Sequence, residues 1–115
     1  MSQTSTRLSE DHYAYITARA RPEGAFMSEL KKEASKAGIP SIAISPEQAA
    51  FMAVLLRAAG VKEVVEVGTL AGYSAISMAL ALPADGHVRT IEFAPAHADF
   101  AEAWIARSEA AGKIS

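Results

Sequence analysis

The segment that most constrains the fold is VVEVGTLAGYS, residues 64–74. Its closely spaced valines are typical of a strand that is buried on both faces. Gly68 follows the strand at once, and Gly72 precedes the start of a helical pattern. A strand, a glycine loop and a helix in this order favour a parallel α/β sheet. In such sheets ligands bind beyond the carboxyl ends of the strands, which is where this loop would lie.

Strand and helix patterns alternate along the chain after residue 60. Strands are predicted at Val61–Val67 and His87–Phe93, with a helix at Tyr73–Ala81 between them. A further helix is predicted from Pro95 to Gly112, and residues 113–115 can begin a third strand. This order predicts parallel strands joined by right-handed crossovers, which is a Rossmann-like α/β unit.

Two helices are predicted near the start of the chain. Ser9 can cap the first, which fades near residues 21–22 because Pro22 disfavours helical geometry in the residue before it. The second runs from about Glu23 to Ala37, and Gly38 stops it. Its charged side chains, Lys31 among them, are expected on a solvated face.

A third helix has the clearest start signal in the chain. Ser45 is placed as the N-cap, Pro46 as the first helical residue, and Gln48 where it completes a capping box. Gly60 ends this helix. The side chains predicted to point inward are those of Phe51, Met52, Leu55, Leu56 and Ala59. We therefore divide the chain into accessory helices with an extended connector, residues 1–45, and the first half of a Rossmann-like domain, residues 46–115.

Composition and charge exclude several classes of function. Half of the 115 residues are hydrophobic and 21% are charged, as in a folded globular protein. A net charge of −2 gives no electrostatic footprint for nucleic acid or an anionic membrane. Cysteine is absent, which excludes a thiolate nucleophile and a zinc–sulfur site. The polar start of the chain lacks the apolar core of a signal peptide, and no apolar run is long enough to span a bilayer. We expect a soluble, cytoplasmic protein.

The spacing of the loop argues against a site for the phosphates of a dinucleotide. Such a site has the pattern Gly-x-Gly-x-x-Gly, whereas this loop reads Glu66-x-Gly68-x-x-x-Gly72. Gly68 lacks the Cβ that would obstruct a ligand, and Gly72 lets the following helix approach. Glu66 would repel a phosphate but suits a cation. S-adenosylmethionine (SAM) carries an ammonium group, a sulfonium and no phosphate, so the loop favours SAM.

A second acid stands at the end of the second predicted strand. Glu92 follows the loop by roughly twenty residues, where an acid can accept both hydroxyls of a ribose. Because SAM and NAD share adenosine, Glu92 does not discriminate between them, although it argues against NADP. The alternatives are structural: an ion pair of Glu92 with Arg89 or His97, and a solvated strand-end acid at Glu66.

From about residue 23 onward the sequence resembles the cation-dependent O-methyltransferases related to catechol and caffeoyl-CoA O-methyltransferases, and their bacterial members most. The segments EVGTLAGYS and ALPADGHVRTIE carry the resemblance. It implies a Rossmann-like SAM-methyltransferase fold, a divalent cation such as magnesium, and methyl transfer to a small phenolic or catechol-type hydroxyl. It also implies that the helices ahead of the sheet help to form a homodimer.

The resemblance implies a set of cofactor-binding residues. Glu66, Gly68 and Thr69 match positions around the methionine part of SAM, and Ser74 matches one whose hydroxyl bonds the carboxylate end. Glu92 matches the ribose acid, and Ile44 contacts SAM largely through its backbone. With the second loop glycine, the predicted set is Ile44, Glu66, Gly68, Thr69, Gly72, Ser74 and Glu92.

No catalytic or metal-binding residue is assigned in this chain. In the family these residues follow later strands of the sheet. His12, His87 and His97 show no metal-ligand spacing and are expected in surface or turn positions.

Two questions stay open at this point. In the family's sheet the first strand is central, so here it would keep an unpaired apolar edge. We expect either a fragment of a domain about twice as long or a chain that completes its sheet with another chain, for example by dimerising. Two alternative functions also remain: a non-catalytic or degenerate module for SAM binding or dimerisation, and, less favoured, an NAD-dependent oxidoreductase.

Overall fold

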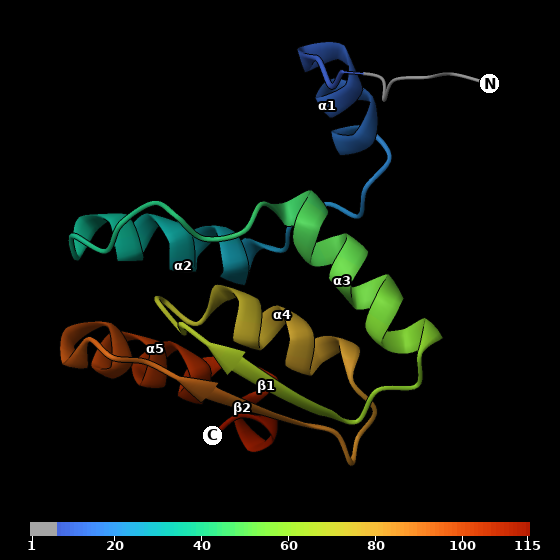
Figure 1. Ribbon diagram of the computed structural model, residues 1–115. Helices are drawn as coiled ribbons and strands as arrows, with labels where there is room; N and C mark the ends of the chain where they lie inside the picture. Colours follow the sequence, from blue (N-terminus) through green and yellow to red (C-terminus); the bar gives the residue numbers. More distant parts are fainter. Residues whose placement is uncertain (1–6) are drawn as a thin grey trace.

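A computed structural model describes residues 7–115, so the first six residues of the polar start lie outside it. The elements alternate as the sequence predicts (Figure 1). They are α1 (Glu10–Thr17), α2 (Ala25–Lys36), α3 (Pro46–Ala58), β1 (Glu63–Val67), α4 (Tyr73–Ala81), β2 (His87–Ile91), α5 (Pro95–Arg107) and a short 3₁₀ turn at Ala111–Lys113. Within the described range, no helix is both long and apolar enough to cross a membrane.

The two strands pair in parallel, and α4 connects them. The register runs from Glu63 opposite His87 to Val67 opposite Ile91. On the other edge of β2, Ile114 forms a parallel bridge with Val88, as expected for the beginning of a third strand. The α/β fold class is therefore confirmed, with β2 between β1 and the end of the chain.

Only one face of this sheet is covered by the described residues. Val64 and Val88 point into a cluster with the α4 side chains of Ala75, Met78 and Ala79. The alternate residues point the other way, and Val65 and Val67 are 68% and 83% exposed. The prediction that β1 is buried on both faces is wrong for this chain, because α3, α4 and α5 leave the opposite face bare.

The main core lies between α2, the start of α4 and α5. Leu30 and Ile76 are fully buried there beside Trp104. Phe26 packs edge-on against Trp104 with ring centroids 5.3 Å apart, and Phe100 stacks on the same indole ring. These contacts join the accessory helix α2 to the α/β unit that follows it.

Three predicted boundaries need correction. β1 begins at Glu63 rather than Val61, because the Val61 N–H still bonds the Leu56 carbonyl at the end of α3. β2 ends at Ile91 rather than Phe93. α5 ends at Arg107 rather than Gly112, because Ser108 is extended and its hydroxyl bonds the Ile105 carbonyl.

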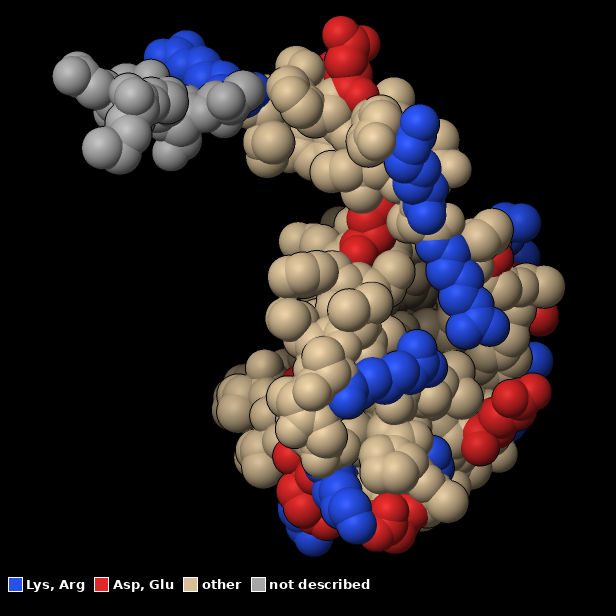
Figure 2. Space-filling model, turned by 90° about the vertical axis from the view of Figure 1, so that its right-hand side faces the viewer, with Lys and Arg blue, Asp and Glu red and all other residues tan. Residues whose placement is uncertain are grey.

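The prediction of which α3 side chains point inward is also partly wrong. Met52 and Leu56 pack toward α4, whereas Phe51, Leu55 and Ala59 are exposed. Residues 52 and 56 share the side of the helix that packs toward α4, so neighbours about 100° around the helix face outward. Helix α1 has no buried residue and projects from the rest of the molecule (Figures 1 and 2), and at its end the Thr17 hydroxyl donates to Glu47 of α3 at 3.0 Å.

Candidate cofactor-binding site

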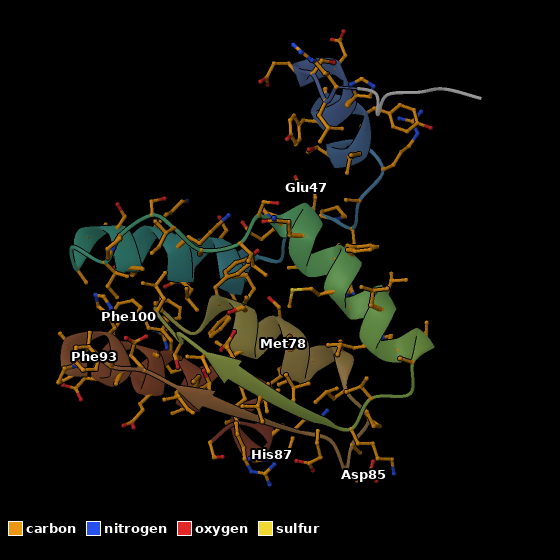
Figure 3. The ribbon with its side chains drawn as sticks, viewed as in Figure 1. Glu47, Met78, Asp85, His87, Phe93 and Phe100 are labelled. Carbon is orange, nitrogen blue, oxygen red and sulfur yellow. The ribbon has the colours of Figure 1, made fainter. Side chains whose placement is uncertain are left out.

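The predicted site residues meet at the carboxyl ends of β1 and β2. Figure 3 marks this end by Phe93, which follows β2, while Asp85 and His87 mark the opposite end of the same strand. An open hollow of about 650 Å³ lies there. Its lining includes Pro40, Ile42, Ile44, Met52, Glu66, Val67, Gly68, Thr69, Leu70, Tyr73, Ser74, Met78, Glu92, Ala94 and His97. Of the predicted set, only Gly72 is missing from this lining.

The loop between β1 and α4 has the left-handed backbone that its glycines allow. Gly68 has φ +97° and donates its N–H to the Ile91 carbonyl at 2.8 Å, which ties the loop to the end of β2. Gly72 has φ +86° and lies against α5, where a Cβ would come within 3.5–3.7 Å of Ile105 and Ala101. A Cβ at these distances would make an ordinary van der Waals contact, so the left-handed φ rather than a lack of space favours glycine at this position.

Glu92 ties this loop to the beginning of α5. Its Oε2 accepts the Leu70 N–H at 2.7 Å and its Oε1 accepts the Ala94 N–H at 2.9 Å. These backbone bonds hold the pKa of the Glu92 carboxyl below its ordinary value, and the bond from Ala94 has the largest effect. His97 Nδ1 lies 3.8 Å from Oε1, so this structural alternative is present beside the hollow. The alternative ion pair of Glu92 with Arg89 is not formed, because Arg89 pairs with Glu63.

Glu66 is held by hydroxyl groups. Ser74 donates to Oε1, and Thr90, opposite Glu66 in the register, donates to Oε2 at 2.6 Å. The Thr90 hydroxyl also lies 2.6 Å from that of Thr69. Glu66 is thus a half-buried, fixed carboxylate at the hollow, and the alternative of a free solvated acid is wrong.

Thr90, which donates to Glu66, was not among the residues predicted from the sequence. Residue 90 lies two positions before Glu92 and therefore on the same face of β2, which was a usable signal. The register was also needed, since only the pairing of residue 66 with residue 90 brings the two side chains together.

Ser74 has a different bond from the one its resemblance implies. Its hydroxyl has a single hydrogen, which is directed at Glu66 in this structure. The oxygen can still accept a bond from a ligand. Donation to a carboxylate of SAM would require that the bond to Glu66 be given up.

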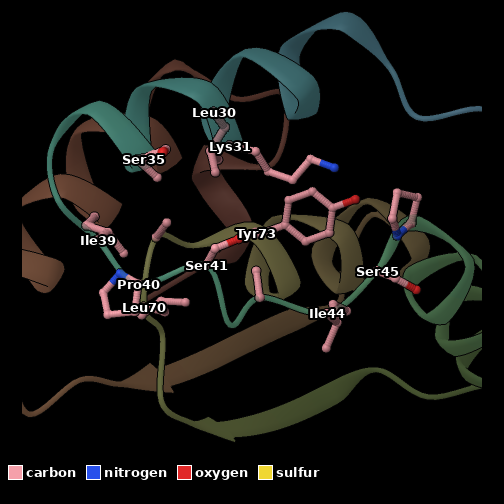
Figure 4. Close-up of a pocket in the computed structure, with 14 residues that line it drawn as sticks. Leu30, Lys31, Ser35, Ile39, Pro40, Ser41, Ile44, Ser45, Leu70 and Tyr73 are labelled. Atoms are coloured by element: carbon pink, nitrogen blue, oxygen red, sulfur yellow. The ribbon is translucent and has the colours of Figure 1, made fainter.

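A smaller hollow of about 210 Å³ lies on the other side of the connector, between α2 and the start of α4 (Figure 4). The Tyr73 hydroxyl donates to Glu23 at 2.6 Å, and Lys31 pairs with the same carboxylate at 2.8 Å. Burial, reinforced by Glu23, raises the pKa of Tyr73. Lys31 therefore lies partly inside this polar cluster, which corrects its placement on a fully solvated face. Ile44 lines both hollows.

Metal-ligating side chains do not gather in the part of the chain that the structure describes. Among residues 7–115 there is no group of three histidine or acidic side chains placed to hold a metal ion. No metal ligand is assigned to this chain.

Comparison with known protein families shows which family the chain belongs to. A family described as O-methyltransferase matches residues 16–115. The chain belongs to this family. This O-methyltransferase sequence is 45% identical over 74 residues to a catechol O-methyltransferase of Niastella koreensis, covering 64% of this chain and 34% of that protein. It is 33% identical over 82 residues to a caffeoyl-CoA O-methyltransferase of Populus kitakamiensis, covering 70% of this chain and 35% of the relative.

Solved O-methyltransferases share the fold. The Bacillus cereus enzyme, crystallised with S-adenosylhomocysteine (SAH), superposes with a TM-score of 0.83 at 30% identity, covering 89% of this chain and 46% of that one. TomG from Streptomyces achromogenes, in complex with SAM, gives a TM-score of 0.79 at 28% identity with the same coverage. The resemblance seen in the sequence is confirmed, and the Rossmann-like fold with it. The chain spans about a third of these curated relatives and about half of these solved chains.

Proposed function

We propose that the hollow at the ends of β1 and β2 binds SAM, and that the chain is the cofactor-binding half of an O-methyltransferase. In this proposal residues 46–115 form the first half of the SAM-binding domain, and residues 1–45 are accessory helices and a connector. The observation that carries it is the placement of two acids, Glu66 and Glu92, at neighbouring strand ends around one hollow. Two solved relatives of similar fold hold SAH or SAM.

The two acids suit different parts of SAM. Each carboxylate oxygen of Glu92 already accepts one backbone N–H and keeps a lone pair, so the pair can also accept the two ribose hydroxyls. Glu66 is directed toward the methionine part, where its charge complements the ammonium group. Gly68, Thr69, Ser74 and Ile44 line the space between, and Gly72 sets the entry of α4.

The residues of this chain orient the cofactor. SAM supplies an electrophilic methyl group on its sulfonium, and the described residues bind the nucleoside and the ammonium group around it. Fixing both ends of the cofactor favours transfer because alignment of the reacting atoms is a large part of catalysis. The family's divalent cation has no ligand set among residues 7–115, and no step is assigned to it.

The remaining assignments rest on the relatives and on composition. Relatives named for catechol and caffeoyl-CoA support a small phenolic or catechol-type acceptor. A homodimer, or completion of the sheet by another chain, is supported by the bare sheet face. A cytoplasmic location is supported by the lack of cysteine.

Isothermal titration of the 115-residue chain with SAH tests the proposal. We expect binding, and a loss of about tenfold or more in Glu92→Ala, because a charge-assisted contact to ribose is removed. Glu63→Ala is the matched control, since Glu63 is an acid at the start of β1, outside the lining of the hollow, and pairs with Arg89. Circular dichroism checks that each variant folds. A folded wild-type chain that does not bind SAH would contradict the proposal. We expect this chain to bind SAH without transferring methyl to a catechol in magnesium, because residues 7–115 hold no metal ligand set.

A further inference from the structure

Glu66 differs from Glu63 and Asp85 in what compensates its charge. Glu63 pairs with Arg89, and Asp85 pairs with Lys62 at 2.5 Å. Within residues 7–115, Glu66 takes part in no ion pair, and its recorded side-chain partners are hydroxyl groups. The carboxylate is therefore fixed in place while its negative charge stays uncompensated by a basic side chain.

The direction of the hydrogen bonds around Glu66 follows from the number of hydrogens. Thr90 has one hydroxyl hydrogen, which is donated to Oε2 of Glu66. The bond between Thr90 and Thr69 must then use the Thr69 hydrogen, so Thr69 donates and Thr90 accepts. Thr69 is only 5% exposed, which leaves its hydroxyl little access to competing water. The result is a directed chain, Thr69 to Thr90 to Glu66, that ends on the carboxylate.

Hydroxyl donors and basic side chains have different effects on a carboxylate. A lysine or arginine would orient Glu66 but would also cancel its charge toward a ligand. Neutral hydroxyls orient the group and leave the charge available. Threonine is suited to this because its branched Cβ restricts rotation about χ1.

From this geometry we infer that Thr90 and Thr69 are positioning residues that orient the Glu66 carboxylate toward the ammonium group of the ligand. The inference rests on the proposed function and deepens it. It assigns selectivity for a nucleoside thioether that carries an ammonium group to a pair of hydroxyls, one of which lies outside the lining of the hollow.

Two ligands and two substitutions separate this role from a merely structural one. SAH carries the ammonium group, whereas 5′-methylthioadenosine has the same nucleoside and a thioether but no amino-acid end. In Thr90→Val, which keeps the shape and the backbone bond to Ser115, we expect SAH affinity to fall about tenfold and methylthioadenosine affinity to stay within about twofold. Thr90→Ser should restore SAH binding. Ser77→Ala is the control, because it removes a hydroxyl from α4 that bonds only within the helix.

These titrations test the positioning role separately from the proposed SAM site. An equal loss for both ligands in Thr90→Val, or no loss for either, overturns the positioning role while the proposed SAM site stands. Failure of Thr90→Ser to recover SAH binding also overturns it. A folded wild-type chain that binds neither ligand overturns the proposed function and this inference with it.

Discussion

At the scale of single residues, the loop at the site is held in place by the same acid that is proposed to bind ribose. Among residues 7–115, Leu70 is the one non-glycine residue with positive φ, at +52°. This conformation is costly for a branched residue and needs support from its surroundings. Glu92 supplies that support by accepting the Leu70 N–H at 2.7 Å. If Glu92 binds ribose as proposed, one carboxylate links the loop geometry to ligand binding.

The lowered pKa of Glu92 gives this link a defined pH dependence. Because the carboxyl has a lower pKa in the folded than in the unfolded chain, its stabilising effect is complete above the ordinary glutamate pKa of about 4. The effect is lost as pH falls through the lowered value. We expect Glu92→Gln to lower the urea midpoint at pH 7, since an amide replaces one acceptor oxygen by a donor, and the difference from wild type to shrink in acid.

Urea titrations between pH 7 and pH 3 measure this difference. Glu102→Gln is the control, because Glu102 is an exposed acid of α5. A gap between wild type and Glu92→Gln that stays constant over this range would contradict the proposed linkage.

The sequence predicted most of the residues that gather around the hollow but not the bonds among them. Glu66, Gly68 and Glu92 could be placed because each stands at the end of a predicted strand, where a parallel sheet collects its ligand contacts. Thr90 and the direction of its bonds could not be placed, because they depend on the strand register and on side-chain hydrogens. The hydrogen bond from the Ser74 hydroxyl to Glu66 also could not be predicted, because it depends on the folded geometry.

At the scale of elements, local signals decided which predictions succeeded. Helix α4 begins and ends where predicted, since Gly72 sets its start and Pro83 follows its end. The start of α3 is also as predicted, with Ser45 and Gln48 forming the capping box. The exposed side of α3 was wrong, because apolar composition does not show which stripe of a helix finds a partner. In the same way, a run of valines does not show whether both faces of a strand are covered.

The capping box of α3 gives a prediction at this scale. The Ser45 hydroxyl accepts the Gln48 N–H at 3.3 Å, and the Gln48 side chain accepts the Ser45 N–H at 2.9 Å. Ser45→Ala should lower the free energy of unfolding by about 1 kcal/mol, because an N-terminal donor of the helix loses its partner. Gln48→Glu should leave stability nearly unchanged, since glutamate also completes a capping box. Urea unfolding measures the free energy of unfolding of both variants. An unchanged value in Ser45→Ala would show that the cap does not stabilise the fold.

At the scale of the whole molecule, the bare sheet face is the largest departure from a closed α/β domain. Val65, Val67, Ile91 and Phe93 are exposed together at the carboxyl ends of the two strands, and Phe93 is 99% exposed. The free edge of β1 adds unpaired backbone groups beside them. Apolar surface of this kind is a site of association.

We expect the chain to associate through this face. Sedimentation velocity should show concentration-dependent association of the wild-type chain, and the double substitution of Val67 and Phe93 to threonine should shift it toward monomer. Phe51→Ser is the control, because Phe51 is exposed on α3, away from the sheet face. A wild-type chain that stays monomeric at every concentration, with a high and cooperative melting temperature, would contradict this expectation.

Amide NMR spectra during titration with SAH test whether the loop after β1 and the acid after β2 form one SAM site. We expect the shifts that change with SAH to cluster at residues 68–74 and 92–97, with smaller changes near Ile44. Amides of α1 should not move, since that helix lies apart from the hollow. Saturable changes centred on other residues, or no change in a folded sample at millimolar SAH, would contradict it.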